Sequence, residues 1–325
     1  MLNANGLDAP PAMPVVHDLY GIRVRTPWPV SGVASQRADS WDVEFVDGDR
    51  ALLAQAAAHV PPHQAAWWAQ YAALPDGSSY RRWTNLFEFL VMPDARRIHA
   101  RTLNADAHDE ALLAYLLVDA LSFSMVRLGR EPLHATAVQT DNGVAAFVGD
   151  SGDGKSTLAA LFVRGGGRLL TDDMLILSDE KDGFAAQPGP PRIKLYRDVA
   201  TRIFGAGCHG VPMNAVTEKL IIALDDGQIA RAPARVSALY LIHDDHGDAP
   251  ARPVIRRLSP AEALPRILGA MAAHCPSGPE RIRRQFDLVT RLVARMPIKT
   301  LSYRRQPDDM WPVRDAVLDD LARAE

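Results

Sequence analysis

The sequence predicts an α/β (α+β) protein in two parts, an N-terminal α/β segment over residues 1–130 and a second domain over residues 131–325. Three observations predict this fold class. Residues 20–102 contain short runs in which apolar and polar side chains alternate, as in half-buried strands. Residues 109–128 carry apolar side chains at helical spacing. From residue 134 onward, an apolar strand leads through a glycine-rich loop into a helical segment. The length of 325 residues agrees with about two domains.

Composition and charge argue against several classes of protein. Lys and Arg number 36 and Asp and Glu 39, so the net charge of −3 argues against a broad surface for nucleic acid or anionic lipid. The two cysteines, Cys208 and Cys275, are too few for a disulfide framework or a four-cysteine zinc site. The longest apolar stretch, residues 111–123, is shorter than a membrane span and contains Asp119. The N-terminus lacks the pattern of a signal peptide, so we expect a cytoplasmic protein with neither nucleic acid nor a membrane as partner.

The N-terminal segment begins with a proline-containing tail over residues 1–15 and continues with strands. Residues 20–46, 80–92 and 97–102 alternate in the manner of strands, and Asp47-Gly48-Asp49 and Asp76-Gly77 are turn signals. These features predict an antiparallel sheet. A helix over residues 109–128 follows it, and Gly129 marks the end of that helix.

Short strands and helices alternate in the second domain. Residues 144–148 are predicted to form a buried strand, which is followed by a helix over 155–164 that ends at three consecutive glycines. Leu169-Leu170 begins a second buried strand, which runs into Asp172-Asp173. Further strands are predicted at 219–224 and 236–243, and further helices at 260–271, 279–296 and 312–324.

The loop between the first strand and helix of this domain fits the pattern G-x-x-x-x-G-K-[ST]. Glycines allow the backbone to fold so that its N–H groups point at phosphate oxygens, and the next helix directs its positive end at the same anion. A lysine here supplies a cation for the β- and γ-phosphates, and the serine after it supplies a hydroxyl for Mg²⁺. We expect a nucleoside triphosphate to bind through Gly149, Asp150, Ser151, Gly152, Asp153, Gly154, Lys155, Ser156 and Thr157.

Two aspartates, Asp172 and Asp173, end the second buried strand. A carboxylate at this place holds Mg²⁺ or accepts the proton of an attacking hydroxyl in phosphoryl transfer. Adjacent residues of a strand point to opposite faces, so both side chains reach one site only if the strand gives way to a loop there. The alternative is a turn with two solvated acids. His134 lies at the start of a strand, where it is either a core histidine or a site residue.

The segment GDSGDGKSTLAALFVRGGGRLLTDD, together with His134 ahead of it, resembles the catalytic core of the HPr kinase/phosphorylase family. The resemblance implies a P-loop-containing core like that of phosphoenolpyruvate carboxykinase, with a mixed sheet. It implies a kinase that uses Mg²⁺ and transfers the γ-phosphoryl group of ATP, or of another nucleoside triphosphate, to a protein serine. On the matching positions it assigns the base to Asp172, Mg²⁺ binding to Asp173 and Ser156, and charge neutralisation to Lys155. It also makes His134 a site residue.

The chain departs from that family in three respects. Thr157 stands where its HPr kinases carry glutamate, their glycine-rich signature after the aspartates is missing, and residues 1–130 do not resemble their N-terminal domain. The chain is more similar to the related kinases of peptide modification, which include lasso-peptide kinases. This implies a precursor peptide, or another peptide or protein with an acceptor serine, as partner. Analogy with the family's hexamers implies self-association as a homo-oligomer.

Three basic residues beyond the aspartates, Arg192, Lys194 and Lys219, are candidates for binding phosphate or an acidic peptide. A looser likeness to the family covers residues 191–195 and Lys219, and it implies nucleotide contacts for Arg192 and Lys219. The alternative is that all three are solvated surface residues. Two other functions stay open, a small-molecule kinase and a nucleotide-sensing module without turnover. Lys155, Ser156 and Asp172 together favour a kinase, because binding alone does not need a base.

Overall fold

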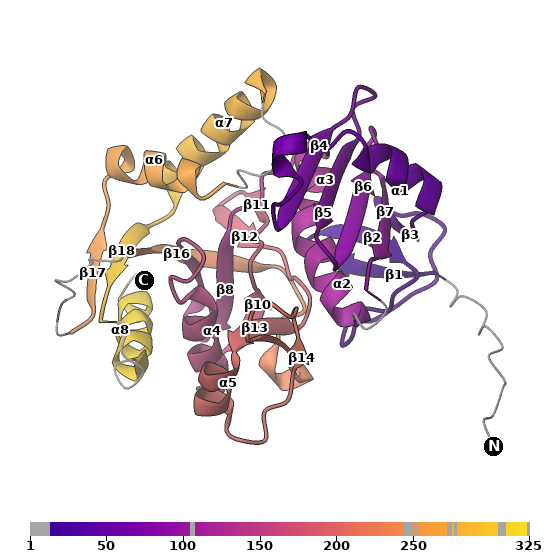
Figure 1. Cartoon of the computed structure of the whole chain (residues 1–325). Helices are drawn as coiled ribbons and strands as arrows, with labels where there is room; N and C mark the ends of the chain where they lie inside the picture. Colours follow the sequence, from indigo (N-terminus) through magenta and orange to yellow (C-terminus); the bar gives the residue numbers. More distant parts are fainter. Residues whose placement is uncertain are drawn as a thin grey trace, which may run out of the picture. The chain divides into compact units, whose positions relative to one another are not determined.

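The computed structural model describes residues 14–104, 108–243, 250, 252–271, 275, 278–304 and 310–323, which form two compact units (Figure 1). The first unit comprises residues 1–18, 22–30 and 34–105. The second unit comprises residues 106–325 with two short pieces of the N-terminal part, 19–21 and 31–33. The boundary that we predict at residue 130 therefore falls inside the second unit.

The first unit is built on a seven-stranded sheet with the order β1-β2-β3-β7-β6-β5-β4. Its strands are β1 (Val15–Leu19), β2 (Ile22–Thr26), β3 (Val43–Asp47), β4 (Ala69–Ala73), β5 (Ser79–Trp83), β6 (Phe87–Val91) and β7 (Arg97–Thr102). The pairs from β4 to β7 are antiparallel, as predicted, but β3 runs parallel to both β2 and β7. The expectation of a purely antiparallel sheet is wrong, because alternation identifies a strand without specifying the direction of its neighbour.

A helix follows β3 at the place where the sequence predicts a turn. α1 (Arg50–Ala57) begins after Asp49, whose carboxylate accepts hydrogen bonds of 2.8 and 2.9 Å from the N–H groups of Ala51 and Leu52. The acidic residues before α1 are therefore a helix start. Leu53 of α1 belongs to the core of this unit, and η1 (Pro62–Gln64) leads on to β4.

The predicted helix over residues 109–128 is confirmed and belongs to the second unit. It consists of α2 (Asp109–Tyr115), the π-helical segment η2 (Leu116–Ala120) and α3 (Leu121–Arg127). Gly129 has a φ of 78°, which suits its predicted place just after the helix.

The second unit contains an eight-stranded mixed sheet, which confirms the predicted α/β class. The order is β10-β8-β9-β16-β12-β11, with β18 paired to β16 and β17 paired to β18. Its strands are β8 (Ala135–Thr140), β9 (Gly143–Val148), β10 (Arg168–Thr171), β11 (Leu177–Glu180), β12 (Gly183–Ala186), β16 (Ala234–His243), β17 (Val254–Arg257) and β18 (Ile298–Ser302). β9, β16 and β18 run parallel, and β8, β10, β12 and β17 run antiparallel to their neighbours.

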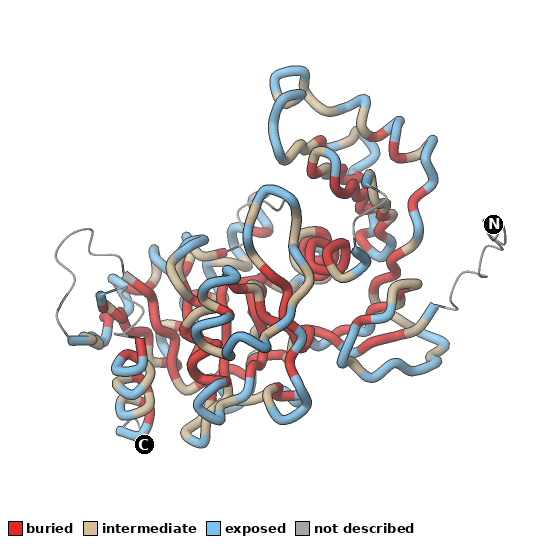
Figure 2. Tube along the Cα trace, turned by 60° about the horizontal axis from the view of Figure 1, so that its bottom comes forward, coloured by how far each residue is buried: buried red, intermediate tan, exposed pale blue. Residues whose placement is uncertain are grey.

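Helices lie on both faces of this sheet, because successive side chains of a strand point to opposite faces. Along β9, Ala145 and Phe147 share a core with α4 (Lys155–Arg164), α5 (Arg197–Phe204) and α8 (Met310–Ala322). Ala146 and Val148 share the other core with α6 (Pro260–Gly269) and α7 (Pro279–Arg295). Figure 2 shows that buried residues lie in the interior of the fold, including most of the helix over residues 109–127, and that many exposed ones lie in outer loops.

The remaining elements lie near the ends of these strands. β13 (Arg192–Tyr196), β15 (Lys219–Ala223) and β14 (Val211–Pro212) form a small antiparallel sheet in the order β13-β15-β14, and η3 (Asp226–Gln228) follows β15. The helices predicted at 155–164, 260–271, 279–296 and 312–324 are confirmed to within about two residues of their ends. In the described part of the chain, no helix combines the length and the hydropathy that crossing a bilayer requires.

Candidate functional site

The glycine-rich loop joins β9 to the N-terminus of α4, as predicted. Gly152 and Gly154 have φ values of 97° and 89°, which other residues adopt only with strain. Gly154 is also the residue that caps α4, and Lys155 is the first residue of that helix. The first N–H groups of a helix have no partner within it, so they are free to bind an anion held by the loop.

The Lys155 side chain is held against its own loop. Its ammonium donates hydrogen bonds to the carbonyl oxygens of Gly149 at 2.9 Å and Asp150 at 2.8 Å, and only 5% of the residue is exposed. Burial lowers the pKa of Lys155, and the nearby aspartates oppose that effect. The Lys155 ammonium is thus bonded to two carbonyl oxygens. A phosphate bound in the loop would take the place of these oxygens as its partner.

His134 connects Lys155 to the second aspartate. Its Nε2 lies 3.0 Å from Lys155 Nζ, and its Nδ1 lies 3.2 Å from the carbonyl oxygen of Asp173. Since an ammonium only donates and a carbonyl only accepts, Nε2 is the acceptor and Nδ1 carries the proton. Burial and the charge of Lys155 lower the pKa of His134, which favours this neutral ring. His134 therefore contacts the lysine of the loop and the second aspartate, and it is not an isolated core histidine.

Asp172 is buried and accepts three hydrogen bonds. Its Oδ1 accepts from the hydroxyls of Thr136 at 2.7 Å and Ser156 at 2.8 Å, and its Oδ2 accepts from the backbone N–H of Lys194 at 3.0 Å. Burial and the charge of Asp173 raise the pKa of Asp172. This carboxylate therefore joins the first turn of α4 to β8 and β13.

Asp173 has a different environment from its neighbour. Its φ of 67° lies in the left-handed region, where the strand gives way to a loop. Its carboxylate forms an ion pair with the ammonium of Lys194. Burial alone would raise the pKa of Asp173, but the Lys194 charge outweighs it and holds the pKa at about 2. Asp173 is therefore ionised at neutral pH.

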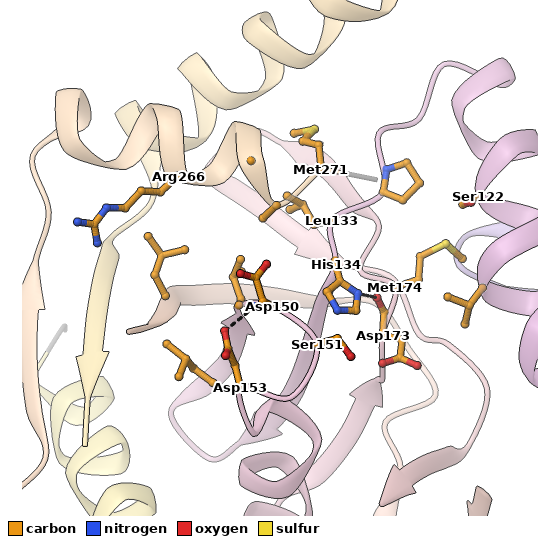
Figure 3. A pocket seen from close by; sticks show the side chains of 18 residues that line it. Ser122, Leu133, His134, Asp150, Ser151, Asp153, Asp173, Met174, Arg266 and Met271 are labelled. Atoms are coloured by element: carbon orange, nitrogen blue, oxygen red, sulfur yellow. Dashed lines mark hydrogen bonds between the residues drawn. The ribbon is translucent and has the colours of Figure 1, made fainter. Parts of the chain in front are cut away.

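A cavity of about 720 Å³ borders the loop, His134 and Asp173, but Asp172 does not line it (Figure 3). Its polar side chains are those of Ser122, His134, Asp150, Ser151, Asp153, Asp173 and Arg266. Its apolar lining includes Leu133, Val148, Met174, Leu241, Ile242 and Met271. Figure 3 shows His134 beside Asp173, with the loop residues along one side of the cavity. The cavity volume is in the range of about 300–1,000 Å³ that is typical of ligand sites.

The structure brings most of the predicted site residues into one cluster, made of two series of contacts that meet at Lys194. Lys155, His134 and Asp173 form one series of contacts, and Ser156 and Asp172 form another. Ser156 thus lies against Asp172, although the resemblance pairs it with Asp173 for Mg²⁺. Within the loop, the Asp150 N–H donates to Asp153 Oδ2 at 2.5 Å. The remaining loop residue, Thr157, lines a second, smaller cavity.

Arg192 and Lys219 have environments unlike that cluster. Arg192 is buried, and its guanidinium contacts Glu110 Oε2 at 3.1 Å and the carbonyl oxygen of Leu113 at 2.8 Å. Its hydrogen bonds therefore hold α2 against β13. Lys219 lies over the ring of Tyr196 at 5.2 Å. Its charge contributes to the lowered pKa of Lys155, so it lies within electrostatic reach of the loop.

The sequence analysis did not identify Thr136 and did not separate Lys194 from other basic residues. Thr136 lies two positions after His134, so the two side chains share one face of the strand segment. The two-residue spacing from His134 is the feature of the sequence that could have indicated Thr136. Lys194 had no comparable signal, because its partner Asp173 is distant in the sequence.

The residues present fit a magnesium ion that is held together with phosphate oxygens. Among the described residues, no group of three His, Cys, Asp or Glu side chains could hold a metal by itself. Mg²⁺ is usually bound by one or two carboxylates, with substrate phosphates and water as the other ligands. The Ser156 hydroxyl and the Asp172 carboxylate, in contact at 2.8 Å, supply this donor set.

No protein-family model and no curated protein sequence matches the chain. Among solved structures, the Hpr(Ser) kinase/phosphatase from Coxiella burnetii is similar with a TM-score of 0.33 and 13% sequence identity. The alignment covers 59% of this chain and 88% of that chain.

Proposed function

We propose that the chain is an ATP-dependent kinase that transfers the γ-phosphoryl group to a serine hydroxyl of a peptide or protein. One observation carries the proposal. The phosphate-binding loop and both aspartates belong to one cluster, connected by Lys155, His134 and Ser156, and this cluster borders a cavity large enough for a substrate. A protein that only bound nucleotide would not need a buried acidic pair beside the loop.

The nucleotide binds through the loop in this proposal. The N–H groups at the start of α4 and the positive end of its dipole attract the phosphates. Lys155 exchanges the carbonyl oxygens of Gly149 and Asp150 for phosphate oxygens. Because Lys155 is buried beside the loop, its charge acts at short range on the group that is transferred.

The two aspartates have different roles in this proposal. The resemblance assigns the base to Asp172, but Asp172 does not line the cavity that would hold the acceptor. Asp173 lines the cavity and is ionised. Access to the acceptor proton is the first requirement of a general base, and of the two aspartates Asp173 meets it. We therefore assign the base to Asp173 and the binding of Mg²⁺ to Asp172 with Ser156.

The reaction follows from this arrangement. The acceptor hydroxyl in the cavity donates a hydrogen bond to Asp173, and its oxygen faces the γ-phosphorus in line with the leaving oxygen. The new O–P bond forms as the bond to the β-phosphate oxygen breaks, and the hydroxyl proton passes to Asp173. Lys155 stabilises the spreading negative charge. Mg²⁺, when bound, neutralises charge on the phosphate oxygens.

The acceptor proposed first is a serine of a ribosomally made precursor peptide. An extended peptide offers apolar side chains for the wall formed by residues such as Leu133, Met174 and Met271. A small-molecule acceptor is the second candidate, because the volume of about 720 Å³ also suits a metabolite.

The test incubates the full chain with Mg²⁺, ATP labelled on the γ-phosphate and the precursor peptide encoded beside its gene. Label on the peptide, and its loss when the peptide serines are replaced by alanine, supports the proposal. Label on a metabolite in an extract supports the second candidate. Tight ATP binding without transfer indicates a nucleotide-sensing module, and absence of ATP binding overturns the proposal. The Lys155→Ala variant is the control for background transfer.

A further inference from the structure

A second cavity, of about 230 Å³, lies on the loop beside the first turn of α4. Its lining comes from the loop and from three helices, α4, α5 and α8, which share one core. The loop and α4 contribute Gly152, Gly154, Thr157 and Leu161. Its other walls include Val199 and Ile203 of α5 and Tyr303, Met310 and Trp311 from the C-terminal part of the chain.

The two cavities use different residues of the same loop. Gly149, Asp150, Ser151 and Asp153 line the larger cavity, whereas Gly152, Gly154 and Thr157 line the smaller one. The larger cavity also contains His134 and Asp173, and the smaller one contains neither. The loop therefore has a cavity with three aspartates on one side. The cavity on its other side has apolar and aromatic walls together with Asp198 and Arg202.

A nucleoside triphosphate has the γ-phosphate at one end and the nucleoside at the other. The proposed function determines the position of the γ-phosphate end. The γ-phosphate has to face Asp173 and the acceptor, so the larger cavity takes the acceptor. The nucleoside extends from the α-phosphate, away from the group that is transferred. Building on the proposed function, we propose that the smaller cavity binds the nucleobase, with Trp311 as the aromatic side chain that the base contacts.

The lining of the smaller cavity suits a flat aromatic ring. Leu161, Val199 and Met310 give it apolar walls, and the Trp311 indole, 41% exposed, lies at its edge. Stacking on an aromatic side chain contributes to binding for every base, because every base has a π-face. The volume of about 230 Å³ is below the range of about 300–1,000 Å³ typical of whole ligands, so it fits a base with the sugar and phosphates outside.

Trp311 is held in position before any ligand binds. The guanidinium of Arg314 lies over the indole ring at 5.6 Å, and it also donates a hydrogen bond of 3.1 Å to the carbonyl oxygen of Gly165. Gly165 is the residue that ends α4. The indole is thereby tied to the helix that begins at the phosphate loop, which reduces the entropy cost of ordering it around a base.

The experiment compares two ligands that differ in the nucleoside. Titration calorimetry with the full chain and Mg²⁺ measures the affinity for ATP and for inorganic tripolyphosphate, which has no base. Trp311→Ala is expected to weaken ATP binding about tenfold and to leave tripolyphosphate binding unchanged within about twofold. Trp311→Phe should retain most of the ATP affinity. Trp67→Ala is the matched control, because Trp67 is 52% exposed and lies in the first unit.

Each other outcome has a defined meaning. Equal ATP affinity in the wild type and Trp311→Ala overturns the base cavity and leaves the proposed kinase intact. Equal weakening of both ligands also overturns it, because the effect would then come from the phosphate loop. If the wild type binds neither ligand, the proposed function fails and the base cavity with it. Should Trp311→Ala fail to fold, Ile203→Trp, which fills the cavity, is expected to weaken ATP binding alone.

Discussion

The Ser156 hydroxyl, on the first turn of α4, donates a 2.8 Å hydrogen bond to Oδ1 of Asp172, at the end of β10. This bond joins the phosphate loop to the acidic pair directly. The carboxylate next in the chain, Asp173, turns to Lys194 and the large cavity instead. Two adjacent acids therefore face two different partners, and this difference defines the first prediction.

Asparagine substitutions separate the roles of the two aspartates. Asp173→Asn is expected to lower the transfer rate by about 10²–10⁴-fold, because a base is lost, and to retain ATP binding. Asp172→Asn is expected to raise the Mg²⁺ concentration needed for half-maximal ATP binding, because a metal ligand is lost. Calorimetry and a transfer assay at several Mg²⁺ concentrations measure both effects. The opposite result would show that Asp172 is the base: Asp173→Asn would keep its transfer activity, and Asp172→Asn would lose it. Asp172→Asn would then also bind ATP at the Mg²⁺ concentration that the wild type needs.

Thr136 is expected to stabilise the fold through Asp172. Thr136→Val keeps the shape of the side chain and removes the hydroxyl that donates to the buried carboxylate at 2.7 Å. The loss should cost about 1–2 kcal/mol of unfolding free energy in urea denaturation, because Asp172 keeps its other two donors. Thr136→Ser, which restores the hydroxyl, is the control. A Thr136→Val protein as stable as the wild type would contradict the role.

Arg192 is expected to act in stability and not in nucleotide binding. Arg192→Leu breaks the contact with Glu110 and should lower the unfolding free energy by about 2 kcal/mol, since Glu110 is partly exposed and stays partly solvated. The affinity of Arg192→Leu for tripolyphosphate should not change.

Lys219→Ala is expected to show the opposite pattern, with unchanged stability and weaker tripolyphosphate binding. The reason is that the Lys219 charge lies within electrostatic reach of the loop. Weaker binding in both variants would support the nucleotide contact that the family likeness implies for Arg192.

His134 is expected to make the fold less stable in mild acid. Its pKa in the folded chain lies below the ordinary value of 6.5, because of burial and the charge of Lys155. Below about pH 6.5 the unfolded chain takes up a proton that folded His134 does not, so stability falls, by up to about 1.4 kcal/mol per pH unit. Melting temperatures between about pH 8 and pH 5.5 should therefore decrease more in the wild type than in His134→Asn.

The prediction would be contradicted if the melting temperatures of His134→Asn and of the wild type decreased equally with pH. His134 would then have the same pKa in the folded and unfolded chains.

Local patterns predicted the parts of the fold that depend on neighbouring residues. The loop and α4 were predictable because glycine spacing, the apolar strand and the helix are all encoded between residues 143 and 164. The parallel pairs of β3 were not, because strand direction depends on partners far away in the sequence. α1 was missed because Asp49, a residue typical of turns, is equally suited to starting a helix.

The site was predictable in composition but not in arrangement. The spacing identified Lys155, Ser156 and the two aspartates, and all of them lie in the cluster. Which aspartate faces the cavity depends on the backbone turn at Asp173 and on Lys194, and neither has a local signal in the sequence. The contact of Arg192 with Glu110 has no local signal either, because Glu110 is far from it along the chain.

The left-handed backbone at Asp173 also limits which amino acids evolution or a mutational scan can accept there. Glycine, asparagine and aspartate adopt this conformation at low cost, whereas β-branched residues do not. In a saturation library, the Asp173→Gly and Asp173→Asn variants should accumulate as folded, inactive protein. The Asp173→Val and Asp173→Ile variants should instead be depleted at the level of expression. Protein abundance and transfer activity should be measured separately for each variant. Low abundance would then identify substitutions that the backbone conformation does not accept, and low activity at normal abundance would identify those that remove the carboxylate.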